Sequence, residues 1–375
     1  MMLDSPGEAP TRAAVLTALD ADPRLVGLLD PSPTRPFYLS MPWWRSLAEA
    51  ALNRDETLRI YAAEMRDGLR GALLTRARAK RRQGVRALRA LATVYSVEYG
   101  IVGDGEEVNS RVIPVLADAL AAERPRWDII DLGPFERTAT CFERLALELR
   151  RVGFWVQPYF QFGMWYERIA GRDFATFLAM RSGALRTTLK RAPKRLEHLG
   201  HVEIESVRGG GDLAAAIMDY EGVHARSWKP REPYPEFMPR LMREASAVGA
   251  LRLGILRLND RPIAAQVWIV WNRRATIFKL THDERFKRVS PGSVLTMHMM
   301  RRAIEDDQVE EIDFGRGDDP YKRSWLGHRR QFWGVLACNP RTACGLGALV
   351  RHGGSAAAMR GIRRLAGKLG VPRRP

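Results

Sequence analysis

The sequence contains no apolar run long enough to cross a membrane. Its longest such run, Ile263 to Trp271, is interrupted by Gln266 and is far shorter than the roughly 20 residues that a spanning helix requires. The first residues include Asp4 and Glu8 and lack an apolar core, so we expect no secretory signal. Only three cysteines occur among 375 residues, which fits a reducing compartment better than a disulfide framework. We therefore expect a cytoplasmic protein.

Acidic residues are absent from the end of the chain. Between Asn339 and Pro375 there are eight basic residues and no acidic one, and Arg186 to Arg195 holds five basic residues and no acid. Both segments contribute to a net charge of +17. Either can attract an anionic partner such as a phosphorylated cofactor, nucleic acid or a membrane face. An arginine-rich composition with solvated helix faces is the alternative explanation for both.

The order of the predicted elements repeats along the chain. In each half a hairpin, a strand and a helix precede a similar strand, "IIDLG" at 129–133 and "EIDFG" at 311–315. Turn signals at 66–68 and 259–261 mark the two hairpins. The sequence therefore predicts a mixed α/β fold, with two tandem units that each form a twisted mixed sheet flanked by helices. We expect an irregular lead-in at 1–35, units at 36–170 and 171–338, and a basic tail at 339–375.

One segment has the features of a phosphate site. A basic loop ends in Arg288, and Ser290-Pro291-Gly292-Ser293 then begins a helix. The free N–H groups and the positive end of a helix N-terminus attract phosphate or pyrophosphate. Simple capping by Ser290, with Pro291 in the first turn, is the alternative that needs no ligand.

Four stretches together resemble GNAT-type acyltransferases, in the branch of the CelD and FemAB proteins. These are "HARSWKPREPYPEF", "LRLGILRLNDRPIAAQVWIV", "SPGSVLTMHMM" and "EEIDFGRGDDPYKRSW". The resemblance covers about Tyr220 to Leu336 well and the first half loosely. It implies a second, active unit beside a degenerate first one, acetyl-CoA or another acyl-CoA as co-substrate, and an amine acceptor in exopolysaccharide or envelope metabolism. The family's pyrophosphate motif is only partly matched here, by residues 288–293.

Acyl transfer to an amine needs a base for the amine and donors for the oxyanion, and it is helped by an acid for the leaving thiolate. Asp313, at the end of the "EIDFG" strand, is the first candidate for the base, and His282 is the second. Asp313 can instead hold the glycine turn after it, and His282 can be a surface residue. The resemblance implies Tyr321 as the acid, although packing against Trp325 is an alternative role.

The remaining candidates are expected to bind the donor or the acceptor, with ordinary packing or solvated charge as the alternative for each. For the cofactor they are Arg288, Ser290, Gly292, Ser293 and Lys322. For the substrate they are His224, Trp228, Lys229 and Arg316. His198 and His201 share a basic region, but no cysteine or carboxylate partner stands at metal-ligand spacing, so no metal site is expected.

Three other classes of protein are alternatives to this prediction. The tripeptide Asp-Phe-Gly at 313–315 suggests a kinase, but the glycine-rich loop, the strand lysine and the His-Arg-Asp motif of kinases are missing. A FemAB-like transferase that uses aminoacyl-tRNA is the alternative within the same fold, and the basic segments would then contact RNA. A non-catalytic module for an anionic polymer or membrane face is the third possibility. The sequence leaves the oligomeric state open.

Overall fold

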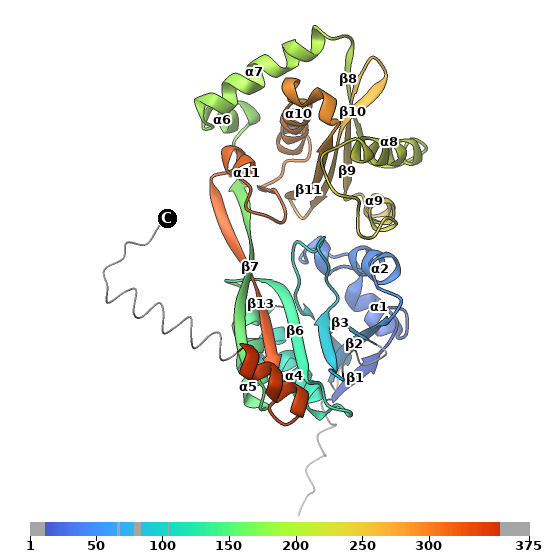
Figure 1. Cartoon of the computed structure of the whole chain (residues 1–375), viewed down its shortest axis with the longest axis vertical. Helices are drawn as coiled ribbons and strands as arrows, with labels where there is room; N and C mark the ends of the chain where they lie inside the picture. The colour runs from blue at the N-terminus through green and yellow to red at the C-terminus, as the bar shows by residue number, and fades with distance from the viewer. Residues whose placement is uncertain (1–11, 66–67, 79–83, 104, 353–375) are drawn as a thin grey trace, which may run out of the picture.

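The computed structural model describes residues 12–65, 68–78, 84–103 and 105–352. Figure 1 shows two halves, each with its own helices, that are joined by the long strands β7 and β13. The described strands form one sheet in the order β1-β2-β3-β4-β6-β13-β7-β12-β11-β10-β9-β8, and β5 pairs with β3 off this path. The predicted mixed α/β fold with two tandem units is therefore confirmed.

The first half contains elements β1 to β7. They are β1 (Arg12–Leu16), α1 (Pro23–Leu29), η1 (Phe37–Leu39), α2 (Met41–Ala50), β2 (Glu56–Met65), β3 (Gly68–Arg78), β4 (Ala87–Ala90), β5 (Val102–Gly103), α3 (Gly105–Glu107), η2 (Val108–Val112), α4 (Ile113–Ala122), β6 (Ile129–Glu136), α5 (Thr140–Arg151) and β7 (Trp155–Arg168). The lead-in expected to be irregular forms β1 and α1 where it is described, so that prediction was wrong. Asp22 caps α1 by accepting a hydrogen bond from the amide of Arg24.

The second half contains the other elements. They are α6 (Phe174–Ala179), α7 (Gly183–Glu197), β8 (Val202–Val207), α8 (Leu213–Ala225), α9 (Phe237–Ala247), β9 (Leu251–Leu258), β10 (Arg261–Trp271), β11 (Arg274–His282), η3 (Glu284–Val289), α10 (Pro291–Glu305), β12 (Glu311–Asp313), α11 (Pro320–Trp325) and β13 (His328–Cys338). Residues 343–352 are helical, and the rest of the basic tail lies outside the described residues.

The two similar strands occupy equivalent places in the sheet. β6 pairs in parallel with β4, and β12 pairs in parallel with β11, each over three residues. The strand that follows each of them is exchanged between the halves, because β6 pairs with β13 and β12 pairs with β7. β7 and β13 also pair with each other along most of their length. The exchange fixes the two halves to each other through backbone hydrogen bonds.

The core of the second half explains why β10 reads as a continuous apolar run. Eight successive residues of this central strand, 263–270, are buried, as expected for a strand covered on both faces. The turn before it places Asn259 and Asp260 at positive φ, which is the conformation that a two-residue hairpin favours. Helix α10 lies close to the sheet: a Cβ on Gly254 would stand 2.7 Å from the Met299 sulfur.

Candidate functional site

A cavity lies where β11 and β12 separate. Their pairing ends at Thr276 and Asp313, although β11 continues to His282. Among the described strands, none pairs with the edge of β11 beyond Thr276 on that side, and a cavity of about 570 Å³ lies beside it. It is lined by Val94, Tyr95, Val97, Trp228, Lys229, Ile277, Phe278, Lys279, Leu280, His282, Lys287, Ser290, Gly292, Ser293, Phe314, Arg316, Asp319, Tyr321 and Lys322.

The structure brings together most of the residues that the sequence singled out. Nine of them line this one cavity: His282, Ser290, Gly292, Ser293, Tyr321, Lys322, Trp228, Lys229 and Arg316. The other three, Asp313, Arg288 and His224, lie outside the lining of this cavity.

Asp313 is fully buried, and its carboxylate is occupied by the protein itself. One oxygen accepts hydrogen bonds from Arg274 Nε at 2.7 Å and from the Thr276 hydroxyl at 3.0 Å. The other oxygen accepts the amide of Gly315 at 2.8 Å, and Gly315 has a φ of +55°. A carboxylate held in this way has no access to an amine in the cavity. The geometry therefore favours the alternative role, in which Asp313 holds the turn after β12.

Arg274 joins this carboxylate to the first half. Its guanidinium also lies 3.2 Å from Glu98 and 3.4 Å from Glu311. Burial alone would lower the pKa of Arg274, but the surrounding carboxylates, Asp313 first, raise it well above its usual value. Burial raises the pKa of Glu98. This buried ionic cluster is a structural joint between the halves.

His282 lines the cavity, and its surroundings suit its imidazole to accept a proton. Its Nδ1 is buried and has no hydrogen-bond partner among the described residues. The ring packs against Trp228 with centroids 4.5 Å apart. Burial lowers the pKa of His282, and the charge of Lys229 adds to this effect, so the imidazole is neutral near pH 7. A neutral imidazole can act as a general base.

Tyr321 is positioned by a chain of buried polar groups. Its hydroxyl lies 3.4 Å from the Thr296 hydroxyl. Gln266, which is fully buried, donates to the Thr296 hydroxyl at 2.7 Å and accepts from the indole of Trp268 at 2.8 Å. The Tyr321 side chain is 37% exposed because it borders the cavity, yet burial still raises the pKa of its hydroxyl. The phenol therefore stays protonated and can donate a proton.

The start of α10 faces the cavity without a side-chain cap. Ser290 occupies the N-cap position in a left-handed conformation, with φ 55° and ψ 49°, and its side chain makes no capping hydrogen bond. The capping alternative for Ser290 is therefore wrong, and Gly292 and Ser293 present the first turn to the cavity. Arg288 is exposed and outside the cavity. Its neighbour Lys287, from the same basic loop, lines it instead.

Glu232 is a central residue that the sequence analysis missed. It lies in the segment between α8 and α9, and accepts hydrogen bonds from the Tyr95 hydroxyl at 2.5 Å and from Lys279 at 2.9 Å. His224 Nε2 lies 3.2 Å from the same carboxylate. Burial opposes ionisation, but the hydrogen bonds from His224 and Tyr95 and the charge of Lys279 outweigh it and lower the pKa of Glu232 to about 2. His224 therefore supports the cavity wall from behind.

The described part of the chain shows neither a metal-binding cluster nor a membrane-spanning helix. No group of three His, Cys, Asp or Glu side chains there could hold a metal ion. Within the same residues, every helix is too short or too polar to span a bilayer.

One family model and several solved structures are similar to this chain. Residues 183–323 match the family model described as acetyltransferase (GNAT) domain, so the predicted resemblance to this superfamily is confirmed there. No curated protein matches the sequence. The crystal structure of FemX is similar, with 11% identity, a TM-score of 0.60 and coverage of 86% of this chain and 96% of that one. A conserved protein of unknown function from Bacteroides thetaiotaomicron VPI-5482 has 13% identity, a TM-score of 0.51 and coverage of 88% and 100%. At these identities the likeness to both structures shows the fold alone.

Proposed function

We propose that this chain, which carries a GNAT acetyltransferase domain at residues 183–323, transfers an acyl group from acyl-CoA to an amine in the cavity between β11 and β12. One observation carries the proposal: an unpaired strand edge leads, through the short helix η3, to a helix start without a side-chain cap. A strand edge can hydrogen-bond the amides of an extended ligand. A helix N-terminus attracts phosphate. A bound acyl-CoA would supply the activated thioester.

The residues at the cavity divide the remaining tasks. His282, neutral and unpartnered, takes the proton from the attacking amine. Tyr321, held near Thr296, donates a proton toward the departing thiolate. Gly292, Ser293 and Lys287 hold the carrier's phosphates. Asp313 and Arg274 keep the strands apart at the correct place, and they do not touch the reacting atoms.

The transfer is direct, without a covalent enzyme intermediate. No cysteine lines the cavity, and its two serines, Ser290 and Ser293, belong to the helix start. Covalent catalysis needs a nucleophile activated by an adjacent base. None of the described hydrogen bonds joins either serine to His282.

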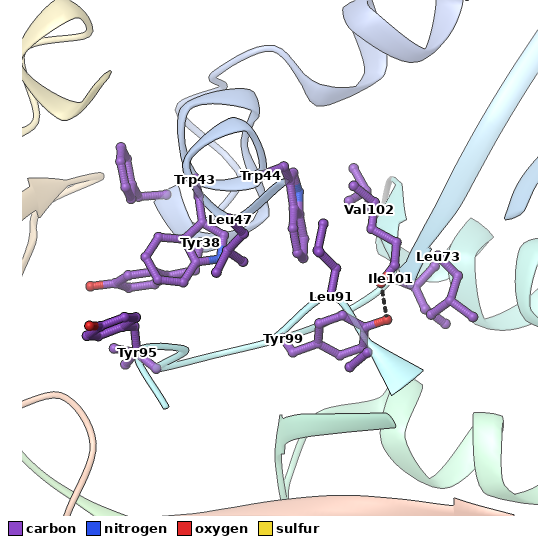
Figure 2. Close-up of a cluster of buried hydrophobic side chains, with 14 of the residues drawn as sticks. Tyr38, Trp43, Trp44, Leu47, Leu73, Leu91, Tyr95, Tyr99, Ile101 and Val102 are labelled. Carbon is purple, nitrogen blue, oxygen red and sulfur yellow. Dashed lines mark hydrogen bonds between the residues drawn. The ribbon is translucent and has the colours of Figure 1, made fainter. Parts of the chain in front are cut away.

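The first half acts as a degenerate partner that shapes the cavity. Its residues 91–101 supply Val94, Tyr95 and Val97 to the wall. Tyr95 stacks on Phe237 of α9 with ring centroids 4.3 Å apart, and Figure 2 shows it at one end of the buried aromatic cluster. The CelD resemblance favours an acceptor from exopolysaccharide or envelope metabolism.

A transferase that takes its acyl group from aminoacyl-tRNA is the second candidate. The whole-chain likeness to FemX supports it at the level of the fold. Helix α7 exposes Arg186, Lys190, Arg191, Lys194 and Arg195 to solvent, and such a helix face can contact an RNA backbone.

Thermal shift separates the two candidates. A ligand that binds only the folded chain stabilises it, and the stabilisation grows with the logarithm of the ratio of ligand concentration to its dissociation constant. Acetyl-CoA, a longer acyl-CoA and free CoA should each raise the melting temperature of the wild type. The variant Ser293→Asp should lose this shift, because it places a negative charge in the first turn of α10; the same charge favours the helix itself. No shift with any CoA would overturn the CoA assignment.

Ser182→Asp is the matched control for this experiment. Ser182 caps α7 by accepting a hydrogen bond from the amide of Leu185, and aspartate is an equally good N-cap. Its CoA shift should equal that of the wild type.

A further inference from the structure

The wall of the cavity carries a strong excess of positive charge. Of the described residues, five cationic side chains line it against one carboxylate, Asp319; the cations are Lys229, Lys279, Lys287, Arg316 and Lys322. They come from the segment after α8, from β11, from η3, and from the segment after β12 together with α11. Chain segments that are distant in sequence therefore bring their charges to a common space.

Three of these cations already have anionic partners. Lys279 lies 2.9 Å from Glu232, which stands just behind the wall. Lys322 lies 3.5 Å from Asp319, and Lys287 is paired with Glu284. Their charges are thus partly neutralised within the chain.

Lys229 differs from these three. Among the described residues its ammonium has no carboxylate within ion-pair distance, and its only recorded contact is the face of the Trp228 ring, 5.6 Å from the centroid. The side chain is only partly exposed. Burial, together with the positive charge of Lys279 and Lys322, lowers the pKa of Lys229 to about 8. A partly buried cation that has no carboxylate of its own and lies near other cations is unfavourable unless an anion compensates it.

We propose that the acceptor carries an anionic group, a phosphate or a carboxylate, which Lys229 binds together with Lys279 and Lys322. This inference rests on the proposed transferase function and adds the chemical class of the acceptor. A charge-assisted hydrogen bond to each ammonium would fix the anionic end of the molecule. Lys229 and His282 are close enough for the charge of Lys229 to affect the imidazole. An acceptor held at Lys229 can therefore place its amine within reach of His282.

The carrier's phosphates do not explain this group of lysines. The helix start at Gly292 and Ser293, with Lys287 beside it, already supplies a phosphate site in the same cavity. Lys229 instead lies near enough to Lys279, Lys322 and His282 for their charges to influence one another. If the lysines nevertheless served the carrier, CoA would leave no place for a second anion.

The test is a binding titration on the full chain saturated with free CoA. Inorganic phosphate and sodium succinate are added separately at pH 7, at constant ionic strength set with potassium chloride, and the melting temperature is followed. We expect at least one anion to stabilise the wild type, and the stronger one indicates which group the acceptor carries. Lys229→Met should weaken the affinity about tenfold or more, the loss expected when a charged hydrogen-bond partner is removed. Arg243→Met, at an exposed position of α9, should bind as the wild type does.

Proton linkage gives a second readout. Above pH 8 Lys229 loses its charge in the free protein, and a bound anion must restore it. The affinity for sulfate, whose own charge is constant in this range, should therefore fall about tenfold from pH 7 to pH 9 in the wild type, and much less in Lys229→Met.

Two results would overturn the inference. One is an absence of stabilisation by either anion in the CoA-saturated wild type, which would assign the lysines to the carrier and leave the transferase function intact. The other is an anion effect that Lys229→Met retains in full. If no CoA binds at all, the proposed function fails, and the same titration without CoA then decides whether Lys229 binds an anion.

Discussion

The two halves have similar strands, β6 and β12, in equivalent positions of the sheet, and they differ in what lies beside these strands. Asp131 of β6 pairs with Arg89 of β4, and Asp313 of β12 pairs with Thr276 of β11, each as the last of three parallel pairs. Asp131 accepts a hydrogen bond from the Tyr159 hydroxyl at 2.6 Å. Asp313 is bound by Arg274. The strand itself therefore does not decide whether a cavity forms beside it.

The space beside β6 is occupied by the chain's own aromatic residues. Tyr99 donates its amide to the Pro134 carbonyl at 2.7 Å, and its ring packs edge-on against Trp44 and Phe135. Figure 2 shows Tyr99 below Leu91 in this cluster. Beside β12 none of the described segments fills the gap, and the cavity remains open. What fills the gap between two diverging strands distinguishes a structural unit from a binding unit.

Replacing His282 should produce the largest loss of activity. His282→Gln keeps the approximate shape of the side chain but removes the base, so turnover should fall roughly 10²- to 10⁴-fold while the CoA thermal shift persists. His198→Gln, at the exposed C-terminal end of α7, is the control and should be fully active. A His282→Gln variant with normal turnover would remove His282 from the mechanism.

The asparagine variants of Asp313 and Asp131 should differ from each other more in stability than in activity. Asp313→Asn weakens a buried ion pair with Arg274 and should lower the free energy of unfolding by about 3 kcal/mol. Asp131→Asn retains an acceptor for Tyr159 and should cost less than about 1 kcal/mol. Urea denaturation measures both. If Asp313→Asn is as stable as the wild type but inactive, Asp313 is the base after all.

The sequence predicted much of the second half because its signals are local. The Asn259-Asp260 turn, the helix beginning at Pro291 and the strand ending at Asp313 each depend on a few adjacent residues. Most of the candidate residues met at one cavity because β11, α10 and α11 follow one another along the chain. Arg288 was misplaced because the basic loop is a 3₁₀-helix, in which the neighbouring Lys287 lines the cavity.

The sequence could not reveal contacts between distant segments. The binding of Arg274 to Asp313 depends on the register between β11 and β12, which neither strand specifies alone. The contribution of Tyr95 to the cavity depends on how the halves meet, and the exchange of β7 and β13 determines that. Glu232 stands in a loop with no periodic pattern, and nothing in the sequence marks it as the partner of Lys279.

Hydrogen–deuterium exchange with and without acetyl-CoA tests the central claim most directly. The account predicts added protection at residues 277–296, which include the free edge of β11 and the start of α10. The part of the first half that lies beside β6 and outside the cavity wall, residues 99–116, should be unchanged, because its own side chains already fill the gap. Protection of residues 99–116, or no added protection at 277–296, would contradict the assignment of the open cavity as the acyl-CoA site.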